Sequence, residues 1–174
     1  SLGAVIREEG PLPVVRALDL IEQISRALAA AHARGVVHRD VKPDNVFLVR
    51  RGDGGEQAKV IDFGISRLPG TGRAERITRA GAIIGTPEYM APEQASGDAV
   101  DHRADVYAAG VLLFEMLTGE LPIEAATPLA TIVAHQTRTP DPPSHRVVGI
   151  PAEVDAIVLR ALAKRPEDRF DSAE

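Results

Sequence analysis

The densest group of side chains that could do chemistry lies in residues 37–45, which read Val-His-Arg-Asp-Val-Lys-Pro-Asp-Asn. Five of these nine side chains can carry a charge, and the segment lies between apolar stretches that must be packed. Taken alone, the segment is equally compatible with a solvated loop that contains a proline turn. Its chemistry therefore depends on what else the fold brings beside it.

A second acid, Asp62, opens an Asp-Phe-Gly tripeptide, and its position relative to Asn45 indicates a cation site. Residues 46–49 and 58–61 are rich in β-forming types, and the turn-forming residues 52–55 separate them, which predicts a hairpin. Asn45 and Asp62 then leave the open end of this hairpin on neighbouring strands. Amide and carboxylate oxygens are hard ligands suited to Mg²⁺ held together with substrate phosphates. A lone Asp-Phe-Gly would be weak evidence, because short tripeptides occur by chance.

The elements that must position these residues are mostly helical. Apolar residues recur at helical spacing between Pro13 and Gly35 and predict an amphipathic helix. A helix over residues 103–118 is apolar nearly all round, which is typical of a helix buried on several sides. We expect further helices at 128–137 and 152–163. The fold class is therefore mainly α with a small β-hairpin, in one unit.

Composition narrows the classes of function. The 174 residues are enough for one domain with a sizeable core. A net charge of -5 disfavours sequence-independent binding to nucleic acid or to an anionic membrane. The absence of cysteine excludes disulfides and thiolate zinc sites and fits a reducing cytosol. The longest apolar run, residues 106–114, is too short to cross a bilayer.

Five motifs stand in an order and spacing that resembles the protein kinase family. They are His38-Arg39-Asp40-x-Lys42-Pro43-x-Asn45, Asp62-Phe63-Gly64, Gly85-Thr86-Pro87-Glu88-Tyr89-Met90-Ala91-Pro92-Glu93, Asp105-Val106-Tyr107-Ala108-Ala109-Gly110 and Lys164-Arg165-Pro166-Glu167-Asp168-Arg169-Phe170. The sequence in and around these motifs, including Ala30-Ala31-His32 and Glu93-Gln94-Ala95, is similar to that of bacterial serine/threonine kinases of the eukaryotic type. The resemblance implies a single partial kinase domain over residues 1–174, with a catalytic loop at 36–46 and an activation segment at 62–93.

The resemblance also implies roles for individual residues. Asp40 would accept or orient the proton of the substrate hydroxyl, and Lys42 would contact the γ-phosphate of ATP. Asn45 and Asp62 would hold Mg²⁺. Thr86 would form a hydrogen bond near Asp40 and Lys42. The presence of Lys42 together with Thr86 indicates Ser/Thr rather than Tyr substrates. Phe47 would lie under the adenine ring of ATP while also serving as a core strand residue.

Other family positions are expected to be structural or regulatory. Glu93 and Arg169 would form an ion pair, Asp105 would bind the backbone around His38 and Arg39, and Phe63 would pack. Arg39 directly before Asp40 indicates control by phosphorylation of the activation segment, because a guanidinium grips phosphate bidentately.

Thr78, eight residues before Thr86, is the first candidate for that phosphorylation. Ser66 and Thr71 are weaker candidates, and Ala80 stands where many relatives have a second Thr. The alternative that Thr78 is an ordinary loop residue stays open.

Part of the kinase pattern has no counterpart in this sequence. No G-x-G-x-x-G loop is found, since Gly70-Thr71-Gly72 has Glu75 at the third glycine position, and the first lysine is Lys42. We therefore expect the N-terminal β lobe to be absent. The chain lacks an initial Met, and residues 171–174 read like a helix start, so both ends look cut.

These observations imply an ATP- and Mg²⁺-dependent serine/threonine kinase fragment. The parent protein would phosphorylate Ser/Thr hydroxyls of protein substrates, and the isolated chain would be weakly active or inactive without its N-terminal lobe. A pseudokinase-like, non-catalytic interaction module is the alternative. We expect no nucleic-acid partner, no membrane contact by this segment, and a cytoplasmic location that is compatible with a membrane-anchored parent.

Overall fold

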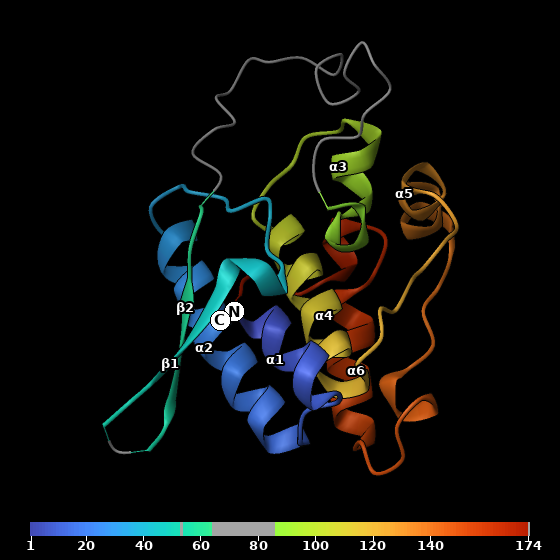
Figure 1. Ribbon diagram of the computed structural model, residues 1–174. Coiled ribbons are helices and arrows are strands. Elements are labelled where there is room, and N and C mark those ends of the chain that lie inside the picture. The colour runs from blue at the N-terminus through green and yellow to red at the C-terminus, as the bar shows by residue number, and fades with distance from the viewer. Residues whose placement is uncertain (53, 64–85, 174) are drawn as a thin grey trace.

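The computed structural model describes residues 1–52, 54–63 and 86–173. Within these ranges it contains six α-helices and one two-stranded antiparallel sheet (Figure 1). The helices are α1 (Leu2–Glu9), α2 (Val14–His32), α3 (Pro92–Ser96), α4 (Arg103–Thr118), α5 (Pro128–Thr137) and α6 (Ala152–Ala161), and the strands are β1 (Val46–Arg50) and β2 (Glu56–Val60). The prediction of a mainly helical fold with a small hairpin is confirmed.

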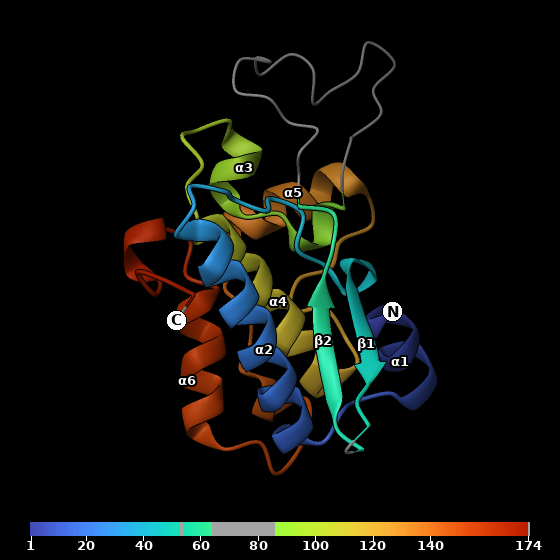
Figure 2. The ribbon, with the colours of Figure 1, turned by 90° about the vertical axis from the view of Figure 1, so that its left-hand side faces the viewer.

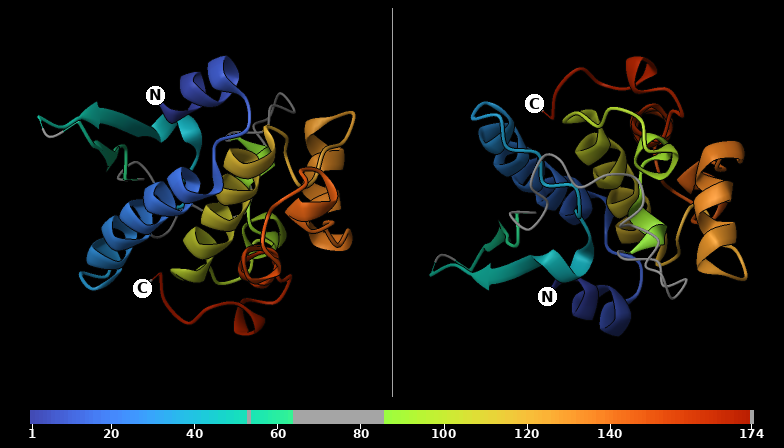
Figure 3. Two further views of the ribbon diagram at one scale, coloured as in Figure 1. Left: turned by 90° about the horizontal axis from the view of Figure 1, so that it is seen from below. Right: turned by 90° about the horizontal axis from the view of Figure 1, so that it is seen from above.

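Helix α4 forms the centre of the core. It lies between α2 on one side and α5 and α6 on the other (Figure 3), and nearly all of its residues are buried. Gly110 permits the close approach of α6, because a Cβ at that position would lie 2.7 Å from the Cβ of Ala161. The helix ends at Gly119, whose φ of 71° is a conformation that glycine adopts without strain. The predicted burial of this helix is confirmed.

The hairpin lies beside α2, with α1 on the far side of β1 (Figure 2). Its register pairs Val46 with Val60, so Asn45 and Ile61 follow at the open end. Gln23 of α2 bonds to the outer edge of β2, since its Oε1 accepts from the amide N of Ala58 at 2.9 Å. This contact satisfies a backbone donor that an edge strand would otherwise expose. The second strand covers residues 56–60, two residues earlier at its start than the sequence pattern predicts.

Other segments also differ from the predictions, and α6 ends at Ala161 rather than at residue 163. Helix α1 was not predicted, because only Leu2, Gly3 and Ile6 of its residues are buried, too few to establish a period. Residues 62–93 show no sustained hydrophobic period and therefore predict a loop, but they contain the 3-10 turn Pro87–Tyr89 and the start of α3, and residues 64–85 lie outside the described part. Residues 171–173, which read like a helix start, form no helix, and Asp171 and Ser172 are bends. No helix among the described residues is long and apolar enough to span a membrane.

Candidate active site

Residues 36–46, the expected catalytic loop and called so below, lie in the connection from α2 to β1, and four of the predicted site residues meet there. Lys42 Nζ lies 3.1 Å from Asp40 Oδ2 and donates to Thr86 Oγ1 at 2.9 Å. Asn45 Nδ2 donates to the carbonyl O of Asp40 at 2.8 Å and to its Oδ2 at 3.2 Å. A carboxylate, a cation, an amide and a hydroxyl thus meet although Thr86 is 44 residues from Lys42 in the sequence.

The Asp40 carboxylate keeps capacity for a further partner. Its side chain is 35% exposed, and its contacts with the side chains of Lys42 and Asn45 both go to Oδ2. No donor in the described ranges contacts Oδ1. A carboxylate oxygen accepts hydrogen bonds, so Oδ1 can receive the proton of a hydroxyl that approaches from solvent.

The backbone before Asp40 is held in an uncommon conformation. Arg39 has a φ of 66°, in the left-handed region that costs a non-glycine residue about 1–3 kcal/mol. Asp105, at the start of α4 and 1% exposed, compensates. Its Oδ1 accepts from the Arg39 amide at 2.7 Å and its Oδ2 accepts from the His38 amide at 2.8 Å. These are the contacts that the resemblance implies for Asp105.

His38 connects the loop to the end of the hairpin. Its buried ring donates from Nε2 to the carbonyl O of Ile61 at 2.9 Å, and its Nδ1 accepts from the Asp40 amide at 3.3 Å. A carbonyl only accepts and an amide only donates, so these partners select the neutral Nε2–H tautomer. The Phe63 ring packs on the imidazole with centroids 4.7 Å apart.

Asn45 and Asp62 lie at the open end of the hairpin, as the sequence predicts. The Ile61 amide donates to the carbonyl O of Asn45 at 2.9 Å, which brings Asp62 into the neighbouring position. The Asn45 amide group faces Asp40 with its Nδ2, and no donor in the described part of the chain contacts its Oδ1. The Asp62 carboxylate is exposed, and no donor in the described residues contacts it.

The Asn45 Oδ1 and the Asp62 carboxylate are oxygen ligands that fit a Mg²⁺ ion, which would take its remaining ligands from water and phosphate. In the ranges that the structure describes, no cluster of three or more His, Cys, Asp or Glu side chains could hold a metal ion by itself.

Glu93 and Arg169 form a buried bidentate ion pair. Arg169 Nη1 and Nη2 donate to the two Glu93 carboxylate oxygens at 2.7 and 2.8 Å. The other three N–H groups of the guanidinium bond to the carbonyl oxygens of Ala163, Arg103 and Lys164. All five donors of a buried cation are therefore satisfied, which a buried charge requires.

The remaining predicted residues are not part of this cluster. Phe47 lies on β1 as expected but is 45% exposed, so the expectation that it belongs to the core is wrong. The guanidinium of Arg39 has a buried Nε without a hydrogen-bond partner in the described part of the chain. Thr78, Ser66 and Thr71 lie outside the described residues.

Two residues that bond to the catalytic loop or its anchor were not predicted. His32 Nε2 donates to Asp105 Oδ2 at 2.7 Å from the last turn of α2. Gln94 Nε2 donates to the carbonyl O of Arg39 at 3.1 Å. His32 belongs to Ala30-Ala31-His32 and Gln94 to Glu93-Gln94-Ala95, stretches that indicate only a resemblance to bacterial kinases. The spacing of these residues in the sequence predicts no contact for either side chain.

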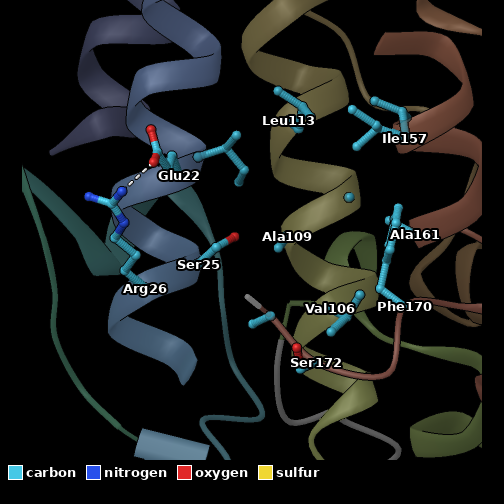
Figure 4. Close-up of a pocket in the computed structure, with 14 residues that line it drawn as sticks. Glu22, Ser25, Arg26, Val106, Ala109, Leu113, Ile157, Ala161, Phe170 and Ser172 are labelled. Atoms are coloured by element: carbon cyan, nitrogen blue, oxygen red, sulfur yellow. Dashed lines mark hydrogen bonds and ion pairs between the residues drawn. The ribbon is translucent and has the colours of Figure 1, made fainter. Parts of the chain in front are cut away.

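An apolar groove of about 620 Å³ lies between α2, α4 and α6 (Figure 4). Leu113, Ile157 and Phe170 contribute to its lining, and the Glu22–Arg26 ion pair lies on the α2 side. None of the predicted catalytic or metal-binding residues lines it, so the groove has no part in the site described above.

The fold is that of a protein kinase. The structure resembles the crystal structure of the Mycobacterium tuberculosis PknI kinase domain, a double mutant, with a TM-score of 0.67 and 30% sequence identity. The match covers 94% of this chain and 52% of that one. The model of the protein kinase domain family matches residues 1–174, and the chain belongs to this family.

Two of the proteins to which the chain is similar are bacterial serine/threonine kinases. The chain is 51% identical over 162 residues to Serine/threonine-protein kinase Pkn1 of Myxococcus xanthus, covering 93% of this chain and 23% of the relative. It is 42% identical over 174 residues to Serine/threonine-protein kinase PknB of Mycobacterium tuberculosis, covering 99% and 27%. The chain thus spans about a quarter of the length of these relatives.

Proposed function

We propose that the protein containing this chain transfers the γ-phosphate of ATP to Ser/Thr hydroxyls of protein substrates, and that residues 1–174 supply the larger, helical lobe of its kinase domain. The observation that carries the proposal is the meeting of Asp40, Lys42, Asn45 and Thr86 within hydrogen-bond distance. A cytoplasmic location belongs to the same proposal, because ATP is the phosphoryl donor.

Each residue has a role in this reaction that its surroundings permit. Asp40 orients the substrate hydroxyl and receives its proton on Oδ1, which no described donor contacts. Lys42, already beside the carboxylate, stabilises negative charge on the phosphoryl oxygens. Thr86 holds Lys42 in place and borders the position of the accepting hydroxyl. Phe47 offers an exposed ring against which adenine could pack.

Asn45 and Asp62 would hold Mg²⁺ through the oxygens that the loop leaves available. Bound there, the ion would neutralise charge on the ATP phosphates. The chain's own contribution is to fix the Asn45 side chain through its hydrogen bonds to Asp40. The metal-binding oxygen of Asn45 and the Asp40 carboxylate would then keep a fixed distance and orientation.

We further propose that Arg39 receives the phosphate of a phosphorylated Thr78. Arg39 directly precedes Asp40 in the chain, and an arginine grips a phosphate bidentately. Replacing Thr78 with Ala is expected to lower activity and remove one phosphate from the protein, as measured by intact-mass spectrometry.

The isolated chain is expected to transfer phosphate weakly or not at all. Its sequence contains neither a glycine-rich phosphate loop nor a lysine before Lys42, and kinases depend mainly on positioning the nucleotide. The same observation favours the second candidate for the chain alone, a non-catalytic module that binds proteins through its helical face.

Phosphate transfer from labelled ATP to a mixed protein substrate separates these functions. The full-length protein should be active, and Asp40→Asn should lower its rate by about 10²- to 10⁴-fold. An inactive full-length protein, or an Asp40→Asn variant with the wild-type rate, contradicts the proposed reaction. Activity of residues 1–174 at an ordinary kinase rate contradicts the expected weakness of the isolated chain.

A further inference from the structure

Gln94 connects the helix after the activation segment to the backbone of the catalytic loop. It follows Glu93 in α3, and its side chain is 96% buried, with a relative exposure of 4%. Its Oε1 accepts from the Ala91 amide at 3.0 Å, and its Nε2 donates to the carbonyl O of Arg39 at 3.1 Å. A buried amide with both ends engaged has a fixed orientation.

The acceptor of this bond belongs to the peptide group that joins Arg39 to Asp40. That peptide is planar, so the direction of its carbonyl sets the plane from which the Asp40 side chain projects. The amide on the other side of Arg39 donates to Asp105. Arg39 is therefore held from two sides, by α4 through Asp105 and by α3 through Gln94.

This double attachment explains how Arg39 keeps its left-handed φ of 66° without a glycine. A conformation of this kind persists only where its surroundings over-determine it. Helix α3 is itself fixed, because the neighbouring Glu93 is paired with the buried Arg169. The bond from Gln94 thus transmits the rigidity of the helical core to the residue before Asp40.

We propose that Gln94 is a positioning residue for phosphoryl transfer, acting through the hydrogen bond from its Nε2 to the Arg39 carbonyl. It contacts no reacting atom and instead sets the orientation of the Asp40 carboxylate. The inference rests on the proposed kinase function. A residue at position 94 must therefore donate a hydrogen bond to the Arg39 carbonyl to support phosphoryl transfer. A side chain of the same size without a donor is not sufficient.

Two variants of the full-length protein separate donation from size. Gln94→Met removes the hydrogen bonds to Arg39 and Ala91, and we expect kcat to fall about tenfold or more at every pH, since misplacement by about 1 Å can cost 10²-fold. Gln94→Glu is nearly isosteric but donates only when protonated. Its kcat relative to wild type should therefore rise as the pH falls from about 8 toward 5.5, whereas the corresponding ratio for Gln94→Met stays flat.

Gln136→Met is the matched control. Gln136 also bonds to α3, through Ser96 Oγ at 3.0 Å, but it does not contact the catalytic loop. Its kcat should equal that of wild type. An unchanged kcat in Gln94→Met, or a Gln94→Glu ratio that does not change with pH, overturns the inference.

Amide hydrogen exchange in the same proteins keeps this inference separate from the proposed function. If the wild-type protein transfers no phosphate, the kinase proposal fails, and exchange over residues 36–46 then decides the role of Gln94. Faster exchange there in Gln94→Met, with unchanged exchange in α4, supports positioning of the loop. Wild-type exchange in residues 36–46 refutes it.

Discussion

The catalytic loop and the helical body around α4 use the same kinds of side chain in opposite ways. In the loop, Asp40 is 35% exposed and keeps an oxygen that no described donor contacts. In the body, Asp105 is 1% exposed and accepts from the amides of His38 and Arg39 and from the His32 ring. A carboxylate that reacts must retain free capacity, whereas one that holds structure has its capacity filled. The two regions therefore predict different responses to substitution.

The largest stability effect is expected for the buried ion pair. Arg169→Met leaves the Glu93 carboxylate buried without its cation, which should lower the free energy of unfolding by about 3–5 kcal/mol. The double variant Glu93→Leu/Arg169→Met should recover part of this loss, because no lone charge remains. Urea unfolding of the chain measures both.

The exposed pair between Arg146 and Glu120 is the control for this prediction. Its atoms are 2.8 Å apart, but its side chains are 43% and 58% exposed. Arg146→Met should therefore cost less than about 1 kcal/mol. Equal losses for Arg169→Met and Arg146→Met would remove the distinction between the two regions.

A somewhat smaller effect is expected from pH. Burial, together with the nearby charge of Lys164, lowers the pKa of His135 from 6.5 to about 4. The unfolded chain then binds more protons at this residue between these pH values, so stability should fall as the pH drops from about 6.5 to 4. Below the lower pKa, the full loss of unfolding free energy from this residue amounts to about 3 kcal/mol.

His135→Gln isolates this contribution, since Gln can still accept from the Tyr107 hydroxyl that lies 2.7 Å from His135 Nδ1. The gap in unfolding free energy between wild type and the variant should shift in favour of the variant as the solution becomes acidic. Parallel curves from pH 7 to pH 4 would show that the buried imidazole does not contribute.

The smallest effect concerns His32, which supplies one of the three donors that contact Asp105 from the described residues. His32→Leu removes that donor and should cost about 1–2 kcal/mol of unfolding free energy. His32→Gln retains an N–H group at a similar reach and should cost less. Chemical denaturation that finds the two variants equal would mean that the bond does not support Asp105.

The sequence predicts the elements with strong local signals. Helix α4 and helix α5 begin and end where expected, because a continuous apolar run, Gly119 and Pro128 mark them. Helix α1 was missed since its few buried residues give no period. The strands of the hairpin were found, although not the start of β2.

The long-range contacts are of a different kind. Nothing in local spacing brings residue 93 to residue 169, or residue 105 to residue 38. Those pairs were named only through the resemblance to kinases, and their functional roles stay predictions. His32 and Gln94 were missed because a single side chain that bonds to a distant carboxylate or carbonyl leaves no pattern in the sequence.

A paired comparison of Asp40→Asn and Asp105→Asn tests the central distinction most directly, with phosphate transfer and urea unfolding measured on each full-length variant. We predict that Asp40→Asn lowers the transfer rate by about 10²-fold or more while the unfolding free energy changes by less than about 0.5 kcal/mol. Asp105→Asn should instead lower the unfolding free energy by at least about 2 kcal/mol. A stable Asp105→Asn protein, or an Asp40→Asn protein that unfolds readily and retains its rate, would contradict the assignment of catalysis to the loop and support to the core.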